Sequence, residues 1–219
     1  MWRRTLLVAW IAQILSLAGF NFAFPFIPFF IQELGVTDPD ELRIWTGFIA
    51  SAPALSMAVM APIWGMIADR VGKKIMMLRA MFFGAVILTS LSFAQSVTTV
   101  LILRVCQGLF SGTMTASAAL IASVTPREKM SYALGLLSSS NFIGISVGPL
   151  LGGLTSEWLG YRPSFLIGAG ILSMGFLLVL LLIREVPAEE ERDVTVQSPV
   201  SGEADEKRGL RTMLTPTLV

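Results

Sequence analysis

The sequence predicts an all-α fold, a bundle of six helices that cross a lipid bilayer. Of the 219 residues, 54% are hydrophobic and only 14% are charged, whereas a soluble domain carries about 25% charged residues. The apolar residues also gather in runs of about 20 or more, which is the length of a membrane-crossing helix and exceeds that of a barrel strand. These two observations indicate a polytopic membrane protein.

Six apolar runs define the predicted spans, and each is long enough to cross about 30 Å of hydrocarbon. They are residues 5–31, 44–68, 75–94, 98–124, 131–156 and 164–183. Beyond them, residues 187–208 are rich in Glu, Asp, Ser and Pro and lack the apolar content needed to fold. We therefore predict a transmembrane domain at residues 1–184, followed by a flexible cytoplasmic linker at residues 185–219.

The charges of the connecting turns predict the orientation, because lysine and arginine concentrate on the cytoplasmic side of a membrane. With the N-terminus inside, only Arg43 and Arg162 lie on the outer side. Nine lie on the inner side: Arg3, Arg4, Arg70, Lys73, Lys74, Arg79, Arg127, Lys129 and Arg184. We expect a multi-pass protein of the cell membrane with both termini in the cytoplasm.

The start of the chain allows a second interpretation. Arg3 and Arg4 precede an apolar stretch, as in a signal peptide, with residues 16–18 as a cleavage site. The apolar character continues past Ala18 to Ile31, which is longer than the apolar core of a usual signal. A membrane span is therefore favoured.

The residue inventory narrows the function classes. The chain has no histidine and a single cysteine, Cys106, so neither an intrachain disulfide nor a Cys/His metal site can form. The sequence contains no Ser/His/Asp set and no phosphate-binding loop. The sequence therefore gives no support for an enzyme, for a metal or other cofactor, or for a nucleic-acid partner. The expected partners are the lipid bilayer and a small-molecule substrate, with protons as a further candidate.

A loop motif joins the second and third spans. Gly65 and Asp69 share one helix face, where a glycine lets another helix approach closely. Gly72 permits the positive φ of a tight turn. The fixed residues of the motif are Gly65, Asp69, Arg70, Gly72, Lys73 and Lys74. The basic residues alone fit an ordinary membrane hairpin. Such a hairpin does not account for the spacing of Gly65, Asp69 and Gly72.

Arg104 is the only charged residue well inside a predicted span. An arginine at that depth costs about 3 kcal/mol on insertion scales unless it is paired or hydrated. We expect it to face a polar cavity, with Gln107, Gln13 and Asn21 as candidate neighbours. The alternative is a structural arginine that donates hydrogen bonds to backbone carbonyls.

A glycine stripe marks the fifth span. Gly144, Gly148 and Gly152 recur every fourth residue and offer a smooth face for a second helix. Pro149 removes a backbone donor and bends the helix. Such a helix suits an element that rocks between two states, and a static packing seam is the alternative.

Several polar residues lie at membrane depth and are expected to face the bundle interior. They are Gln13, Asn21, Ser139, Ser140 and Asn141. Each is a candidate for the substrate path, and each is equally suited to hydrogen bonding between helices. Pro25 and Pro28 predict a kink in the outer half of the first span.

Together these motifs resemble the major facilitator superfamily of transporters. That family's G-x-x-x-D-R-x-G-[RK]-[RK] signature matches residues 65–74, its R-x-x-Q-G element matches residues 104–108, and G-x-x-x-G-P-x-x-G-G matches residues 144–153. The resemblance covers residues 2–184 and is closest to the drug:proton antiporters with twelve helices. It implies the N-terminal half of the family fold, with six helices in two inverted repeats of three.

The resemblance also implies roles for these residues. Residues 65–74 would form a conformational-switch loop, and Arg104, Gln107 and Gly108 would serve proton-linked change. The antiporter motif, which would gate leakage and set the direction of exchange, comprises Gly144, Gly148, Pro149, Gly152 and Gly153. The implied function is proton-coupled efflux of small amphipathic compounds by alternating access. A facilitator-type carrier of sugars or other metabolites and a membrane interaction module without transport are the alternatives.

The chain departs from the family in two ways. A complete member has two such halves with the transport path between them, and only one half is present here. No carboxylate lies inside a predicted span, so a buried acid that couples to protons would reside in the other half. We expect a truncated or split product that needs a second six-helix half; a half-size unit that pairs with itself or a partner is the alternative.

Overall fold

The computed structural model describes residues 2–183, and at Asp69 the backbone alone. Within this range every regular element is a helix, and six helical segments are long and apolar enough to cross a membrane. The all-α fold and the six predicted spans are confirmed. The predicted domain limit at residue 184 and the predicted linker at residues 185–219 lie outside the described residues.

Two of the six spans are interrupted within their length. The first comprises α1 (Trp2–Asn21), η1 (Phe24–Phe26) and α2 (Ile27–Glu33), and the fourth comprises α5 (Val97–Phe110) and α6 (Thr113–Val124). The remaining elements are α3 (Pro39–Val71), α4 (Lys73–Ser92), η2 (Arg127–Lys129), α7 (Met130–Leu159) and α8 (Tyr161–Leu182).

The two interruptions have different causes. In the first span, Pro25 and Pro28 stand at the starts of η1 and α2; they cannot donate the backbone bonds of a continuous helix, and the predicted kink is confirmed. In the fourth span, Gly112 has a φ of +120°, which ends the right-handed helix. The predicted span at residues 98–124 is therefore present, and it consists of two helices.

The helix contacts fit two repeats of three spans. The most extensive contacts pair α1 with α7, α3 with α5, and α4 with α8. If the first, second and third spans are exchanged with the fourth, fifth and sixth, the α1–α7 contact becomes the α5–α3 contact. The α4–α8 contact is converted into itself. The two interrupted spans, the first and the fourth, are also equivalent under this exchange. Both features support the predicted inverted repeats.

Two apolar clusters form the interior of the bundle. One gathers around Phe22, Phe30 and Phe165 and the other around Met77 and Ile121. The rings of Phe26 and Phe30 each lie 5.1 Å from that of Phe165, in edge-to-face contact. Many other large apolar side chains remain exposed, above all on α3 and α7, as expected where lipid or another helix is the neighbour.

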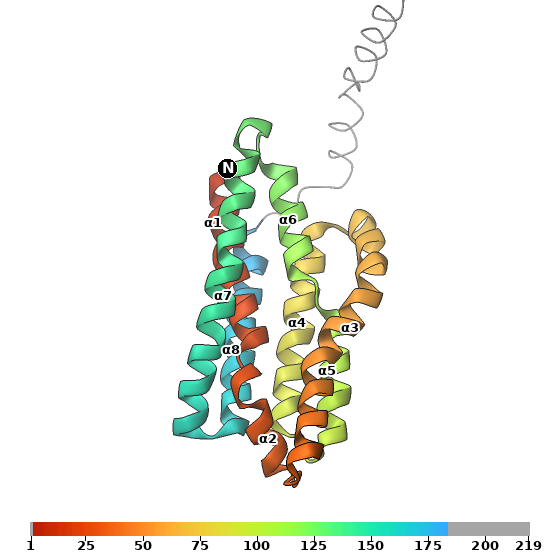
Figure 1. Ribbon diagram of the computed structural model, residues 1–219. Helices are drawn as coiled ribbons and strands as arrows, with labels where there is room; N and C mark the ends of the chain where they lie inside the picture. The colour runs from red at the N-terminus through yellow and green to blue at the C-terminus, as the bar shows by residue number, and fades with distance from the viewer. Residues whose placement is uncertain (1, 184–219) are drawn as a thin grey trace, which may run out of the picture. The chain divides into compact units, whose positions relative to one another are not determined.

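Basic and acidic turns lie at opposite ends of the bundle. The N-terminus of α1 and the turn between α6 and α7 share one end, and α2 lies at the other (Figure 1). At the α2 end, Asp38 caps α3 by accepting from the backbone N–H of Asp40 and Glu41 at 3.0 and 2.9 Å. The basic residues of the loop at 65–74 and of η2 belong to the N-terminal end. This separation agrees with the predicted pattern, and the assignment of the basic end to the cytoplasm stays a prediction.

Candidate functional site

Arg104 lies inside the bundle and is only partly satisfied. Its side chain is 5% exposed, and Nη1 donates to Oε1 of Gln107 at 3.0 Å. Nε and Nη2 are buried and have no acceptor among the described residues. The predicted neighbour Gln107 is therefore present, whereas Gln13 and Asn21 make other hydrogen bonds. A guanidinium with two free donors retains the geometry to bind a carboxylate in bidentate fashion.

A polar network joins α1, α6 and α7. Ser117 donates to Oε1 of Gln13 at 2.8 Å, and Nε2 of Gln13 donates to Oδ1 of Asn141 at 3.4 Å. Ser16 donates to Thr113 at 3.2 Å beside it. Because Gln13 and Ser117 have no exposed surface, these two side chains serve interhelical bonding in this structure.

The other polar candidates behave differently from one another. Ser139 accepts from the indole Nε1 of Trp10 at 3.0 Å, which ties it to α1. Ser140 donates to a carbonyl of its own helix, at Leu137, and Asn21 donates to the carbonyl of Leu17 at 2.9 Å. The structure thus brings Gln13, Ser139 and Asn141 to one seam, and leaves Ser140 and Asn21 bonded within their helices.

The glycine stripe of α7 packs against the backbone of α1. A Cβ atom at Gly144 would lie 2.6 Å from Cβ of Leu17, and one at Gly152 would overlap the carbonyl of Phe22. Only a glycine permits such an approach. Gly153 has no neighbouring atom within 4 Å of the same position, so it does not belong to the contact.

Glycines of the other two motifs also differ in their surroundings. A Cβ at Gly108 would overlap Pro53 and Ser56, so α5 lies directly on α3. Gly72 has a φ of +101° and forms both the end of α3 and the start of α4, which is the tight turn that the sequence predicts. Gly65 has no described atom near its Cβ position, and its helix face is open.

A family model decides the relationship of this chain to known proteins. The model described as Major Facilitator Superfamily matches residues 9–218. The chain belongs to the major facilitator superfamily. The resemblance carried by the three motifs is thereby confirmed, and the six-helix bundle is one half of the superfamily fold.

The relatives of this superfamily member agree with the assignment. Multidrug resistance protein MdtG of Rahnella sp. (strain Y9602) is 41% identical over 184 residues, which cover 84% of this chain and 45% of the relative. MdtG of Salmonella newport (strain SL254) is 39% identical over 202 residues, covering 91% of this chain and 50% of the relative. The chain thus spans about half the length of the curated relatives it matches.

A solved structure shows the same fold. The crystal structure of the human organic anion transporter MFSD10 (TETRAN) superimposes with a TM-score of 0.74 at 20% identity. The match covers 86% of this chain and 49% of that one. The bundle therefore corresponds to one half of a superfamily structure.

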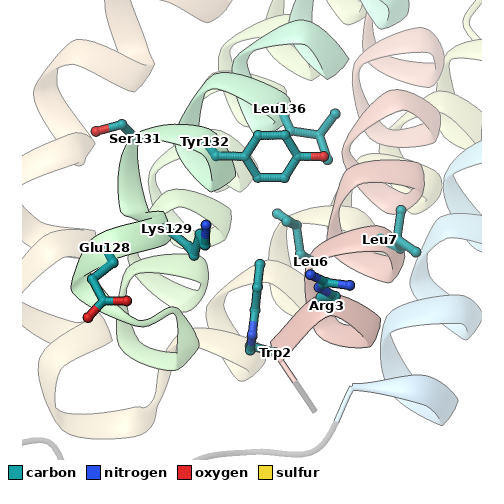
Figure 2. A pocket seen from close by; sticks show the side chains of 9 residues that line it. All are labelled: Trp2, Arg3, Leu6, Leu7, Glu128, Lys129, Ser131, Tyr132 and Leu136. Carbon is teal, nitrogen blue, oxygen red and sulfur yellow. The ribbon is translucent and has the colours of Figure 1, made fainter.

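This half also has a cavity of about 670 Å³ at its basic end. Its lining comes from α1, η2 and α7: Trp2, Arg3, Leu6, Leu7, Glu128, Lys129, Ser131, Tyr132 and Leu136. Figure 2 shows the carboxylate of Glu128 pointing away from the other side chains. The mixture of aromatic, basic and apolar groups is typical of the level where a membrane meets water.

The sequence does not reveal the partner of Arg79. Its guanidinium reaches the interruption between α5 and α6, where it donates to the carbonyl of Ser111 at 3.0 Å. Its Nε and Nη1 atoms are buried. The side chain as a whole is only partly buried, and these two nitrogens, like Nε and Nη2 of Arg104, have no acceptor among the described residues. The adjacent Ser111 and Gly112 are the sequence feature that is compatible with a break here, since sharp kinks occur at Gly/Ser pairs, but they do not reveal that Arg79 binds it.

Proposed function

We propose that the chain is the N-terminal half of a drug efflux transporter, which exchanges small amphipathic compounds for protons by alternating access. The observation that carries the proposal is the pair of interrupted helices in the first and fourth spans. Interruptions at corresponding positions of two repeats are typical of the binding region of secondary transporters. The names of the MdtG relatives support drugs as the substrate class.

The substrate region follows from what surrounds these interruptions. Thr113 is the first residue of α6 and accepts from Ser16 of α1, so polar groups of both interrupted spans meet here. Asn141 and Ser139 are half-buried, whereas Gln13 is fully buried. We therefore assign substrate contact to Asn141 and Ser139 and a supporting role to Gln13, which fixes the amide of Asn141.

Arg104 serves the coupling in this proposal without carrying the proton itself, because an arginine stays protonated in proteins. Its two unpaired donors suit a carboxylate, and the acidic residues of the described chain lie at or near helix ends and turns. They are Glu33, Asp38, Asp40, Glu41, Asp69, Glu128 and Glu157. The carboxylate that takes up the proton would then be contributed by the second half or by the substrate.

The basic end faces the cytoplasm in this proposal, which places the protein in the cell membrane with the loop at 65–74 inside. The second half would cover the exposed apolar faces of α3 and α7 and the open face of Gly65. That arrangement would let the glycine-packed pair of α1 and α7 rock as one body against the other half.

A drug accumulation assay tests the proposal. Efflux-deficient cells that express the product of the complete reading frame containing these residues should accumulate less of a fluorescent cationic drug than control cells. An uncoupler should abolish the difference, because the proton gradient drives the exchange. Uncoupler-insensitive equilibration of a sugar would support a facilitator instead, and unchanged accumulation of every tested drug would refute efflux.

A further inference from the structure

The interruption of the fourth span leaves backbone carbonyls that need donors inside the membrane. A helix that ends in a low-dielectric medium exposes carbonyls at its C-terminus, and each unpaired group costs several kcal/mol. The end of α5 solves this with side chains from two other helices. Nε1 of Trp64 donates to the carbonyl of Leu109 at 2.6 Å, and Nη2 of Arg79 donates to that of Ser111 at 3.0 Å.

The two donors also contact each other. The guanidinium carbon of Arg79 lies 3.3 Å from the ring centroid of Trp64, so the two flat groups stack. Arg79 makes a further, longer bond to the carbonyl of Phe110 at 3.4 Å. A planar cation suits this position because it stacks on the indole, spans two carbonyls and complements the negative end of a helix dipole. A lysine could supply the charge and the donors, but it could not stack on the indole as a flat group.

The contacts of Trp64 and Arg79 with the end of α5, called the clamp below, connect the loop motif at residues 65–74 with the motif that contains Arg104. Trp64 immediately precedes Gly65, the first residue of the loop motif, and it follows Pro62, one of two prolines inside α3. Leu109 follows Gln107 by two residues, and Gln107 holds Arg104. A displacement of the loop at 65–74 therefore has a direct route, through Trp64 and Arg79, to the half-helix that carries Arg104.

We propose that Arg79 is a positioning residue, which with Trp64 clamps the carbonyl end of α5 and couples the loop at 65–74 to Arg104. The coupling role rests on the proposed transport function, whereas the clamp itself does not. Arg79 touches no substrate in this proposal. It sets the orientation of the joint between α5 and α6 that the transport cycle must move.

Hydrogen–deuterium exchange on the purified product of the complete reading frame, in lipid nanodiscs, tests the clamp without any transport assay. Arg79→Gln should accelerate exchange across residues 108–116 by about tenfold, the equivalent of one lost hydrogen bond to a charged group. Arg79→Lys should give an intermediate rate, and Trp64→Phe, which keeps the ring but loses the N–H, should also accelerate this segment. In the double variant the acceleration, expressed as a free energy, should be larger than that of either single variant and smaller than the sum of the two, because both residues stabilise one joint.

Arg43→Gln is the matched control, since Arg43 is an exposed cation of α3 whose partner is Asp40; it should leave residues 108–116 unchanged. Unaltered exchange in Arg79→Gln would overturn the clamp. Equal acceleration across all six spans, in both Arg79→Gln and Arg79→Lys, would show general destabilisation and overturn it as well.

Transport by the complete protein tests the coupling. Arg79→Gln should lower the maximal efflux rate at least fivefold while the half-saturating drug concentration changes less than twofold, and Arg79→Lys should restore part of the rate. A wild-type rate in a variant whose joint exchanges faster would refute the coupling. If the wild-type protein moves no drug, the proposed function fails, and the exchange measurements still decide the clamp.

Discussion

Gly148 and Ala18 touch backbone to backbone: a Cβ atom on Gly148 would lie 2.5 Å from the carbonyl oxygen of Ala18. Gly144 and Gly152 make equivalent approaches one turn to either side. Lipid tails provide no hydrophobic force between helices, so close packing of this kind holds α1 and α7 together. The stripe is thus a contact of the half itself, and any rocking motion must carry both helices.

This contact predicts the effect of a single methyl group. Gly148→Ala should destabilise the bundle by about 1–3 kcal/mol, the usual cost of overpacking, because neither backbone can move away without disturbing three glycine contacts. Thermal unfolding in detergent measures the loss. Gly153→Ala is the matched control from the same helix, since nothing lies near its Cβ position. Equal midpoints for the two variants would contradict the packing described here.

Arg104 predicts a loss of transport without a loss of fold. In Arg104→Leu an apolar side chain replaces a buried guanidinium that has one acceptor, so the folded yield should be maintained while efflux disappears. Size-exclusion chromatography gives the yield, and drug accumulation gives the activity. Arg43→Leu, at an exposed site, should keep both. Full efflux in Arg104→Leu would remove this residue from the mechanism.

Gln13 and Asn21 provide a comparison of two amides on α1. Gln13→Leu removes two hydrogen bonds to other helices, and interhelical bonds in membranes contribute about 0.6 kcal/mol on average. We expect a loss of about 1 kcal/mol. Asn21→Leu removes a bond within the same helix and should cost less. The thermal midpoints of the two variants measure these losses. A lower midpoint for Asn21→Leu than for Gln13→Leu would show that the network around Gln13 does not stabilise this half.

Asn141 predicts a different outcome from Gln13 because part of its surface is exposed. Asn141→Ala should raise the half-saturating drug concentration of the complete protein several-fold while the thermal midpoint falls only slightly. Ser138→Ala, at a neighbouring exposed position of α7, is the control and should leave both values unchanged. An unaltered half-saturating concentration in Asn141→Ala would exclude this residue from the substrate region.

The separation of basic and acidic turns predicts the topology. In a Cys106→Ser background, a cysteine introduced by Lys74→Cys should react with a membrane-impermeant maleimide only after the cells are opened. A cysteine introduced by Asp40→Cys should react in intact cells, because the acidic turn lies at the opposite end of the bundle. Labelling of the Lys74→Cys protein in intact cells would reverse the proposed orientation.

The sequence predicted those features that depend on local chemistry. Span length follows from runs of apolar residues, and the kink of the first span follows from Pro25 and Pro28, which cannot donate. Gln107 lies three residues after Arg104 on one helix, so their contact follows from helical spacing.

Contacts between distant segments could not be predicted in the same way. Gln13 and Asn141 are 128 residues apart, and polar residues at membrane depth fit several interhelical arrangements equally well. Gly112 alone does not reveal an interruption, because glycine is common within membrane helices. The interruption is stabilised by Trp64 and Arg79 from two other helices, and near the end of a span Arg79 resembles an ordinary inner-surface charge.

Coupled exchange in proteoliposomes tests the central claim most directly. The product of the complete reading frame is reconstituted with a pH-sensitive dye in the lumen, and drug is added outside. Drug that enters in exchange for protons should raise the pH of the lumen with the wild-type protein and leave it unchanged with Arg104→Leu. Drug entry at constant luminal pH, or an equal rise with both proteins, would contradict proton-coupled exchange through Arg104.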